Sequence, residues 1–89
     1  MKKEIVTPNH SLLRNMRLYC NKTQKQTAEG LRTTVQFVSN YERRKSPFPA
    51  GKIKRLAKVF GSTVDQVVDC VVLDIRQKIE DEIKRDGLL

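Results

Sequence analysis

Residues 23–43 read TQKQTAEGLRTTVQFVSNYER, and this stretch decides the fold. Thr23 and Gln26 have the spacing of a capping box, which predicts a short helix that begins there and continues through Leu31. Thr33 and Thr34 offer the next N-cap, so a second short helix follows almost at once. Its inward face is expected to consist of Val35 or Phe37, Val38 and Tyr41. The stretch therefore predicts two short helices joined by a tight turn.

Helical spacing continues on both sides of this stretch. Apolar residues at i, i+3, i+4 and i+7 predict a helix over residues 12–20. Two prolines make 43–49 a loop, because proline does not fit inside a helix, and a further helix is expected over 53–60. A second capping box at residues 63–66 opens the longest helix, which is expected to run to Arg85. Five helices with short connections and no alternating strand pattern predict an all-α, five-helix bundle.

The net charge of +8 is spread unevenly along the chain. Residues 1–63 contain 14 Lys and Arg against three Glu, a net charge of +11. Residues 64–89 contain four basic and seven acidic residues, a net charge of −3. A solvated surface normally mixes the two signs more evenly, so the basic part is predicted to bind a polyanion, with nucleic acid as the leading candidate.

Composition argues against several classes of protein. No apolar run approaches the roughly 18–20 residues of a membrane span, and the N-terminal residues lack the apolar stretch of a signal peptide, so a cytoplasmic protein is expected. Cys20, Cys70 and His10 are too few to supply the four ligands of a Cys/His metal site. Because the sequence has no nucleophile–base signature and no Gly-rich phosphate loop, we expect neither an enzyme nor a metal or other cofactor.

Two short helices joined by a three- or four-residue turn on a basic background are the outline of a helix-turn-helix. The residues that extend this pattern are Leu13-Arg14, Arg17, Thr23-Gln24, Ala28-Glu29, Leu31, Val38-Ser39, Tyr41-Glu42-Arg43, Pro49, Ile53, Leu56-Ala57-Lys58, Phe60-Gly61 and Thr63-Val64-Asp65. Over roughly residues 12–68 this set resembles the XRE family, which includes phage Cro proteins and repressors. The resemblance implies a DNA-binding domain whose third helix lies in the major groove.

Three residues of the expected third helix match the base-reading positions of the family, namely Val35, Gln36 and Asn40. Gln and Asn can form paired hydrogen bonds with N6 and N7 of adenine, each worth about 1–3 kcal/mol of discrimination. Val35 can place its methyl groups against a thymine methyl, or it can turn inward to the core. Without the resemblance, Gln36 and Asn40 would be ordinary solvated residues.

Five further residues are expected to contact DNA phosphates. Gln24 and Thr34 stand at expected helix N-termini, where backbone N–H groups and the helix dipole favour an anion, and both match phosphate-contacting positions of the family. Arg43, Arg44 and Lys45 directly follow the expected recognition helix, so their positive charges are expected to meet the DNA backbone.

Arg17 and Glu42 are interpreted as structural residues. In the family, the matching Arg and Glu form an ion pair that ties the first helix to the end of the third. Truncating one partner of such a buried pair costs about 3–5 kcal/mol, because the other charge is left uncompensated.

Three residues depart from the family pattern near the turn. Arg32 stands where the family usually has Gly, so the turn must accept a residue with a side chain. Thr27 replaces a usual Leu, and Gly30 weakens the second helix by about 1 kcal/mol relative to Ala.

The expected last helix carries an apolar stripe. Its part from Val64 to Val72 is expected to join the core, whereas Ile75, Ile79 and Ile83 extend beyond what one small domain can cover. We therefore predict that these isoleucines form a homodimer interface with the same helix of a second copy. The alternative is that the helix folds back on its own domain.

These inferences divide the chain into a flexible segment at 1–10, a DNA-binding domain at 11–72 and an extended dimerisation helix at 73–89. They predict a sequence-specific regulator of transcription, a repressor, that binds double-stranded DNA as a homodimer at an inverted repeat. The alternative is an antitoxin-type interaction module, which binds a partner protein through its C-terminal helix and regulates its own promoter. A basic RNA-binding protein is less well supported, because the aromatic platform usual for single strands is missing.

Overall fold

The computed structural model describes residues 10–85 and Gly87 of the 89-residue chain. Within that part the chain forms five α-helices, one 3-10 turn and no strand, which confirms the expected all-α, five-helix fold. The elements are α1 (Leu12–Tyr19), α2 (Gln24–Leu31), α3 (Val35–Glu42), the 3-10 turn η1 (Ala50–Lys52), α4 (Ile53–Phe60) and α5 (Val64–Arg85). No helix of the described part is both long and apolar enough to pass through a bilayer.

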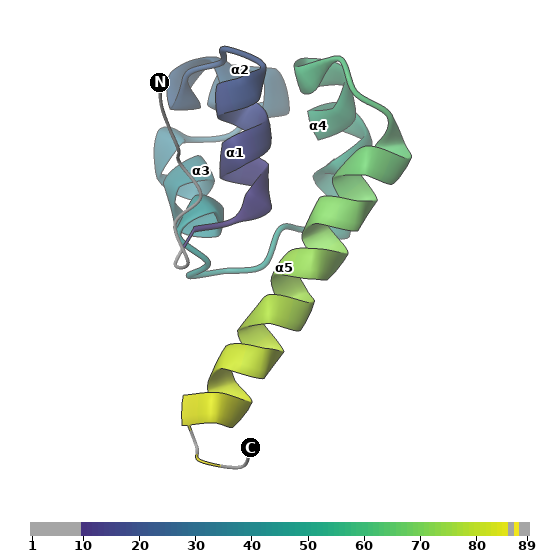
Figure 1. Cartoon of the computed structure of the whole chain (residues 1–89). Coiled ribbons are helices and arrows are strands. Elements are labelled where there is room, and N and C mark those ends of the chain that lie inside the picture. The colour runs from purple at the N-terminus through teal and green to yellow at the C-terminus, as the bar shows by residue number, and fades with distance from the viewer. Residues whose placement is uncertain (1–9, 86, 88–89) are drawn as a thin grey trace, which may run out of the picture.

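The first four α-helices form a cluster, and α5 runs diagonally along it, so that its C-terminal half projects beyond the others (Figure 1). α5 packs on α1 and α4, and α2 packs on α3 and α4. The predicted flexible segment, residues 1–10, lies outside the described residues except for His10. Because α5 is continuous across residues 72 and 73, the division proposed there separates two parts of one helix.

The helix starts follow from the side chains that cap them. Thr23 Oγ1 accepts a hydrogen bond from Gln26 N at 3.0 Å, and Gln26 Oε1 accepts one from Thr23 N at 2.9 Å, which confirms the predicted capping box. Thr63 and Gln66 form the same reciprocal pair at the start of α5. Thr34 caps α3 through one bond from a backbone N–H at 3.1 Å. Each cap satisfies a backbone group that the helix itself leaves without a partner.

The turn between α2 and α3 begins at Arg32, which has a φ of 58° in the left-handed region. Glycine enters this region freely, whereas a residue with a side chain is strained there by roughly 1–2 kcal/mol. The backbone still closes the helix, since Arg32 N donates to Glu29 O at 3.1 Å and Thr33 N donates to Ala28 O at 2.9 Å. The turn therefore accepts Arg in a conformation that favours Gly.

The core lies between the helices and consists of Leu13, Ala28, Leu31, Val38, Tyr41, Phe48, Leu56, Ala57, Phe60 and Val67. Phe37 packs against it from α3, with its ring centre 5.7 Å from that of Tyr41 and 6.3 Å from that of Phe48, in edge-to-face contacts. Val35 stays 43% exposed. Of the two residues that the spacing left open, Phe37 therefore turns inward and Val35 remains on the outer face of α3.

Among the described helices, α1 and α4 pack on α5, and they cover one side of it. Val67 is fully buried, and Val71 is partly buried against the core. Val64 and Val72 are exposed, so the expectation that the whole stripe from Val64 to Val72 joins the core is wrong at these two positions. Successive residues turn by about 100° around a helix. Val64 and Val72 therefore both lie to the same side of Val67, on a face that α1 and α4 leave open.

A buried ion pair holds α1 against the end of α3. Arg17 Nε lies 2.6 Å from Glu42 Oε2, and Arg17 Nη2 donates to Glu42 Oε1 at 3.1 Å. Arg17 Nη1 also donates to Lys22 O at 2.8 Å, and Gln24 Nε2 donates to Glu42 Oε1 at 3.1 Å. Since both charged side chains are buried, these hydrogen bonds compensate the charges in place of water.

Gly30 allows α2 to approach α4 closely. A Cβ atom at position 30 would lie 2.5 Å from Val59 Cγ2, well inside van der Waals contact. Glycine weakens a helix by about 1 kcal/mol relative to alanine, and the close approach of the two helices is what this glycine permits in return.

Replacing Arg17 by Met should lower the free energy of unfolding by about 3–5 kcal/mol, because the buried Glu42 carboxylate would keep, among the described residues, only the hydrogen bond from Gln24. The double variant Arg17→Met/Glu42→Gln should lose clearly less than the sum of the two single variants, since no uncompensated charge remains. Urea unfolding measures these losses, with the partly exposed Arg14→Met on the same helix as the control. Strictly additive losses would contradict a coupled pair.

Gly30→Ala should lower the free energy of unfolding, because overpacking costs about 1–3 kcal/mol and the gain in helix propensity is only about 1 kcal/mol. In a Val59→Ala background the clash is removed, and the same substitution should then raise the free energy of unfolding. Urea unfolding of the two single variants and the double variant tests this change of sign. The same sign in both backgrounds would rule out a steric role for Gly30.

Candidate nucleic-acid interface

The outer face of α3 carries two amide side chains one helical turn apart. Gln36 is exposed, Asn40 is half-buried, and Gln36 Nε2 donates a hydrogen bond to Asn40 Oδ1 at 2.9 Å. This bond holds the two amides in one arrangement and leaves the Gln36 carbonyl oxygen and the Asn40 amide hydrogens available. An adenine edge requires that combination of acceptor and donor. Val35 lies at the start of the same helix and is also exposed.

Two of the predicted phosphate-binding residues lie at helix N-termini. Thr34 is the N-cap of α3, and Gln24 is the first helical residue of α2. Thr34 Oγ1 accepts a backbone hydrogen bond, so its hydroxyl hydrogen can still be donated to a phosphate. Gln24 donates one amide hydrogen to Glu42 and keeps the second. Both residues therefore combine a structural contact with a donor at a position that favours anions.

The basic run after α3 is divided by its backbone conformation. Arg43 and Lys45 are exposed, whereas Arg44 has a φ of 61° and a side chain that is only 16% exposed. The Arg44 guanidinium lies 3.5 Å from Asp81 Oδ2 and 4.0 Å from Asp74 Oδ1, both on α5. Arg44 is therefore paired with acidic residues of α5 and is not exposed beside Arg43 and Lys45, and its phosphate contact stays a prediction.

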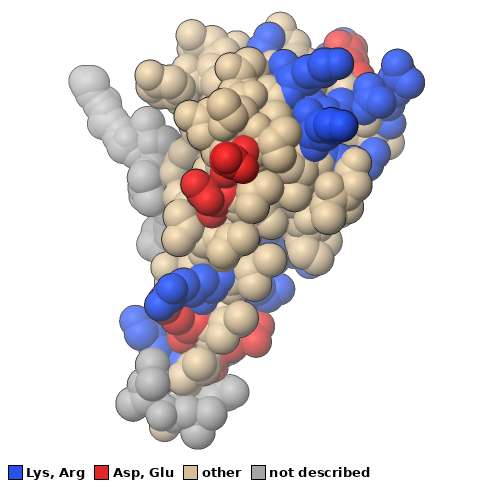
Figure 2. Space-filling model, turned by 90° about the vertical axis from the view of Figure 1, so that its right-hand side faces the viewer, with Lys and Arg blue, Asp and Glu red and all other residues tan. Residues whose placement is uncertain are grey.

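Lys52, at the end of η1, was not among the residues predicted to contact DNA. Its Nζ lies 5.8 Å from the centre of the Phe37 ring, within cation–π range, so its charge is held beside α3. The exposed side of α4 continues this charge with Lys54, Arg55 and Lys58. Figure 2 shows Lys and Arg side chains gathered at one end of the molecule, opposite the tip of α5. Near that tip, positively and negatively charged side chains lie together. The sequence signal that could have identified these cations is their helical spacing opposite an apolar face.

Two ionisable groups of the described residues are shifted toward their neutral forms. Burial raises the pKa of the Tyr41 hydroxyl well above its usual range, and the neighbouring charge of Glu42 adds to the shift. Burial also raises the pKa of the Cys70 thiol on α5, to which Asp74 and Asp69 contribute. Both groups therefore stay protonated near neutral pH and serve as packing residues rather than as a base or a nucleophile.

Comparison with known protein families shows that residues 13–67 match the helix-turn-helix family. No curated protein and no solved structure matches the chain. The matched segment covers more than half of the chain and contains most of α1, all of α2 to α4 and the first turn of α5. DNA-binding proteins of this family are not enzymes, in agreement with the expectation from the sequence, and DNA is their partner. The chain therefore belongs to the XRE-type helix-turn-helix family of DNA-binding proteins.

Proposed function

We propose that the protein is a sequence-specific repressor of transcription that binds double-stranded DNA as a homodimer at an inverted repeat. The observation that carries this proposal is the hydrogen-bonded pair of Gln36 and Asn40 on the outer face of α3. In helix-turn-helix proteins the second helix of the motif lies in the major groove and contacts base edges. Two amides held together there supply the paired hydrogen bonds that distinguish adenine from the other bases.

Phosphate contacts on both sides of α3 would fix the position of the protein on the duplex without selecting a sequence. Arg43 and Lys45 lie after the C-terminus of α3, Thr34 caps its N-terminus, and Lys52 is held beside it. If the three cations each neutralise one phosphate, the logarithm of the affinity per protomer should fall with the logarithm of the salt concentration with a slope of about −2.7. This part of the binding acts on any duplex, and α3 adds the preference for a sequence.

The open apolar face of α5 supports the homodimer. Val72, Ile75 and Ile79 are 55%, 48% and 54% exposed, respectively. Their spacing of three and four residues places them in one stripe along α5. Ile83, the last of the three predicted isoleucines, is half-buried. The exposed stripe therefore begins at Val72 and ends at Ile79, closer to the domain than the predicted one. The same stripe on a second copy provides a self-complementary partner about a two-fold axis.

Gln36→Ala should relax the base preference at one position of each half-site and leave the salt dependence unchanged, because it removes a base contact and no charge. Arg43→Ala should instead weaken binding to all sequences alike and reduce the salt slope by about 1. Selection of sites from a random duplex library, followed by titrations over a salt series, measures both effects. A wild-type protein that binds every duplex equally would refute the sequence-specific repressor.

The double variant Val72→Lys/Ile79→Lys should sediment as a monomer and remain folded by circular dichroism, because both side chains are already exposed in the protomer. Leu73→Lys is the matched control, since Leu73 is also exposed but lies about 100° around the helix from Val72, and it should remain dimeric. A double variant that stays dimeric would exclude this stripe as the interface.

The same sedimentation experiment separates the homodimer from the antitoxin-type alternative. In that alternative, the stripe on α5 binds a different protein, so the wild-type chain alone would sediment as a monomer. That result would contradict the homodimer and leave the DNA-binding part of the proposal in place.

A further inference from the structure

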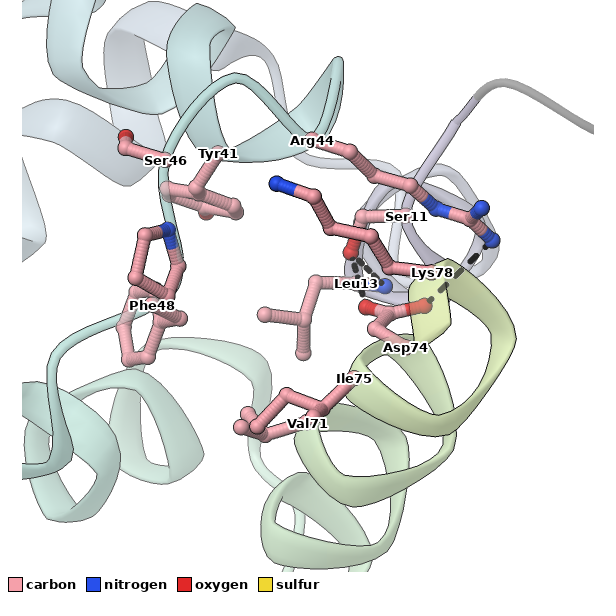
Figure 3. Close-up of a pocket in the computed structure, with 11 residues that line it drawn as sticks. Ser11, Leu13, Tyr41, Arg44, Ser46, Phe48, Val71, Asp74, Ile75 and Lys78 are labelled. Atoms are coloured by element: carbon pink, nitrogen blue, oxygen red, sulfur yellow. Dashed lines mark hydrogen bonds and ion pairs between the residues drawn. The ribbon is translucent and has the colours of Figure 1, made fainter. Parts of the chain in front are cut away.

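The C-terminal half of α5 is held to the domain by polar contacts more than by packing. Val67 is the fully buried residue of this helix, and Val71 is only partly buried. Next to Val71, a cavity of about 60 Å³ lies between α5, α1 and the segment after α3, with walls that include Leu13, Phe48 and Ile75 (Figure 3). Because the packing has a gap here, van der Waals contacts constrain this part of α5 less tightly than they constrain the turn around Val67.

Asp74, at the middle of α5, makes the first of these polar contacts with the domain. Its Oδ1 accepts a hydrogen bond from Leu12 N at 2.9 Å, and its Oδ2 accepts one from the Ser11 hydroxyl. A carboxylate of α5 therefore helps to cap the start of α1. Together with the packing of α5 on α1 and α4, this contact holds the middle of the helix, and the turns that follow need a contact of their own.

Arg44 makes the second contact, and it comes from the segment that directly follows α3. Its guanidinium reaches α5 (Figure 3), with Nη2 lying 4.0 Å from Asp74 Oδ1 and Nη1 lying 3.5 Å from Asp81 Oδ2. Asp81 Oδ1 also accepts a hydrogen bond from Gln77 Nε2 at 2.9 Å, and Lys78 lines the same cavity. Since Asp74 and Asp81 are two helical turns apart, Arg44 adds the second point that a direction requires.

The left-handed backbone of Arg44 belongs to the C-cap of α3, since Arg44 N donates to Tyr41 O at 3.1 Å and Lys45 N donates to Asn40 O at 2.8 Å. The guanidinium group is less favourably placed, because its Nε is buried without a hydrogen-bond partner among the described residues. Such a buried group raises the free energy of the folded state. The ion pairs with α5 account for the burial of the guanidinium in spite of this cost.

We propose that Arg44 is a positioning residue that fixes the direction of the C-terminal half of α5 relative to α3. Its effect on DNA binding rests on the homodimer proposed above, in which two copies meet through α5. The recognition helices of such a dimer would lie about 34 Å apart, so a tilt of about 10° would move one of them by about 6 Å, nearly two base-pair steps. Arg44 therefore determines the spacing between half-sites that the dimer accepts.

The direction of α5 is tested on the full chain without DNA. Residual dipolar couplings of the backbone N–H groups give the angle between α5 and α3 in the wild type, Arg44→Gln and Asp81→Asn. Both variants should change the couplings of residues 76–85 relative to those of α3. Arg76→Gln removes an equal charge from an exposed pair on α5 and should change nothing. Wild-type couplings in Arg44→Gln and Asp81→Asn would overturn the proposal.

The effect on DNA is tested with duplexes whose two half-sites are separated by spacers that differ in single base pairs. The wild type should prefer one spacing, and Arg44→Gln and Asp81→Asn should each reduce that preference by about threefold or more. A phosphate-binding Arg44 predicts different results. Arg44→Gln would then lower the salt slope by about 1, and Asp81→Asn would strengthen binding. Those results, with an unchanged spacing preference, would overturn the proposal.

Failure of the proposed homodimer gives a different outcome from failure of this proposal. A wild type that binds DNA as a monomer shows no preference for a spacing, which removes the homodimer and the spacing role together, while the couplings still decide whether Arg44 directs α5. Changed couplings with an unchanged spacing preference in a dimeric protein would overturn the role of Arg44 in half-site spacing alone.

Discussion

The buried ion pair of Arg17 and Glu42 is the interaction on which the DNA-binding part of the structure depends. Transfer of two charges out of water is unfavourable, and here it is offset by two direct bonds and by bonds to the Lys22 carbonyl and from the Gln24 amide. These groups come from α1, the connection to α2, the first turn of α2 and the last turn of α3. The pair therefore fixes both ends of the helix-turn-helix at once, and with them the face that carries Gln36.

Local signals in the sequence are sufficient to predict most of this fold. Capping boxes, prolines and helical spacing act within a few residues, and all five helices lie close to their predicted bounds. Features decided by distant contacts were not predictable in the same way. Val35 and Phe37 both fit the inward face of α3, and the ring of Phe48, in the loop that follows, is what Phe37 packs against. The exposure of Val72 likewise depends on how little of α5 the other helices cover.

The candidate site shows the same division. The positions of Gln36 and the cap at Thr34 follow from the sequence, because both lie within one short helix and its first turn. The orientation of Arg44 does not, since its partners Asp74 and Asp81 stand 30 and 37 residues later in the chain. As a result, the acidic last helix neutralises one charge of the basic part. The basic part and the acidic helix α5 are thus two surfaces of different charge, and the ion pairs of Arg44 connect them.

The close contact between Gly30 and Val59 limits how the sequence of such a protein can evolve. A side chain at position 30 fits only when position 59 loses volume, so two substitutions that are harmful alone are tolerated together. Selection then acts on the pair, and the two positions are expected to vary together among homologues, with the smaller residue exchanged between α2 and α4. The close approach of these two helices should therefore be detectable without a structure, as correlated substitutions at positions 30 and 59 among homologous sequences.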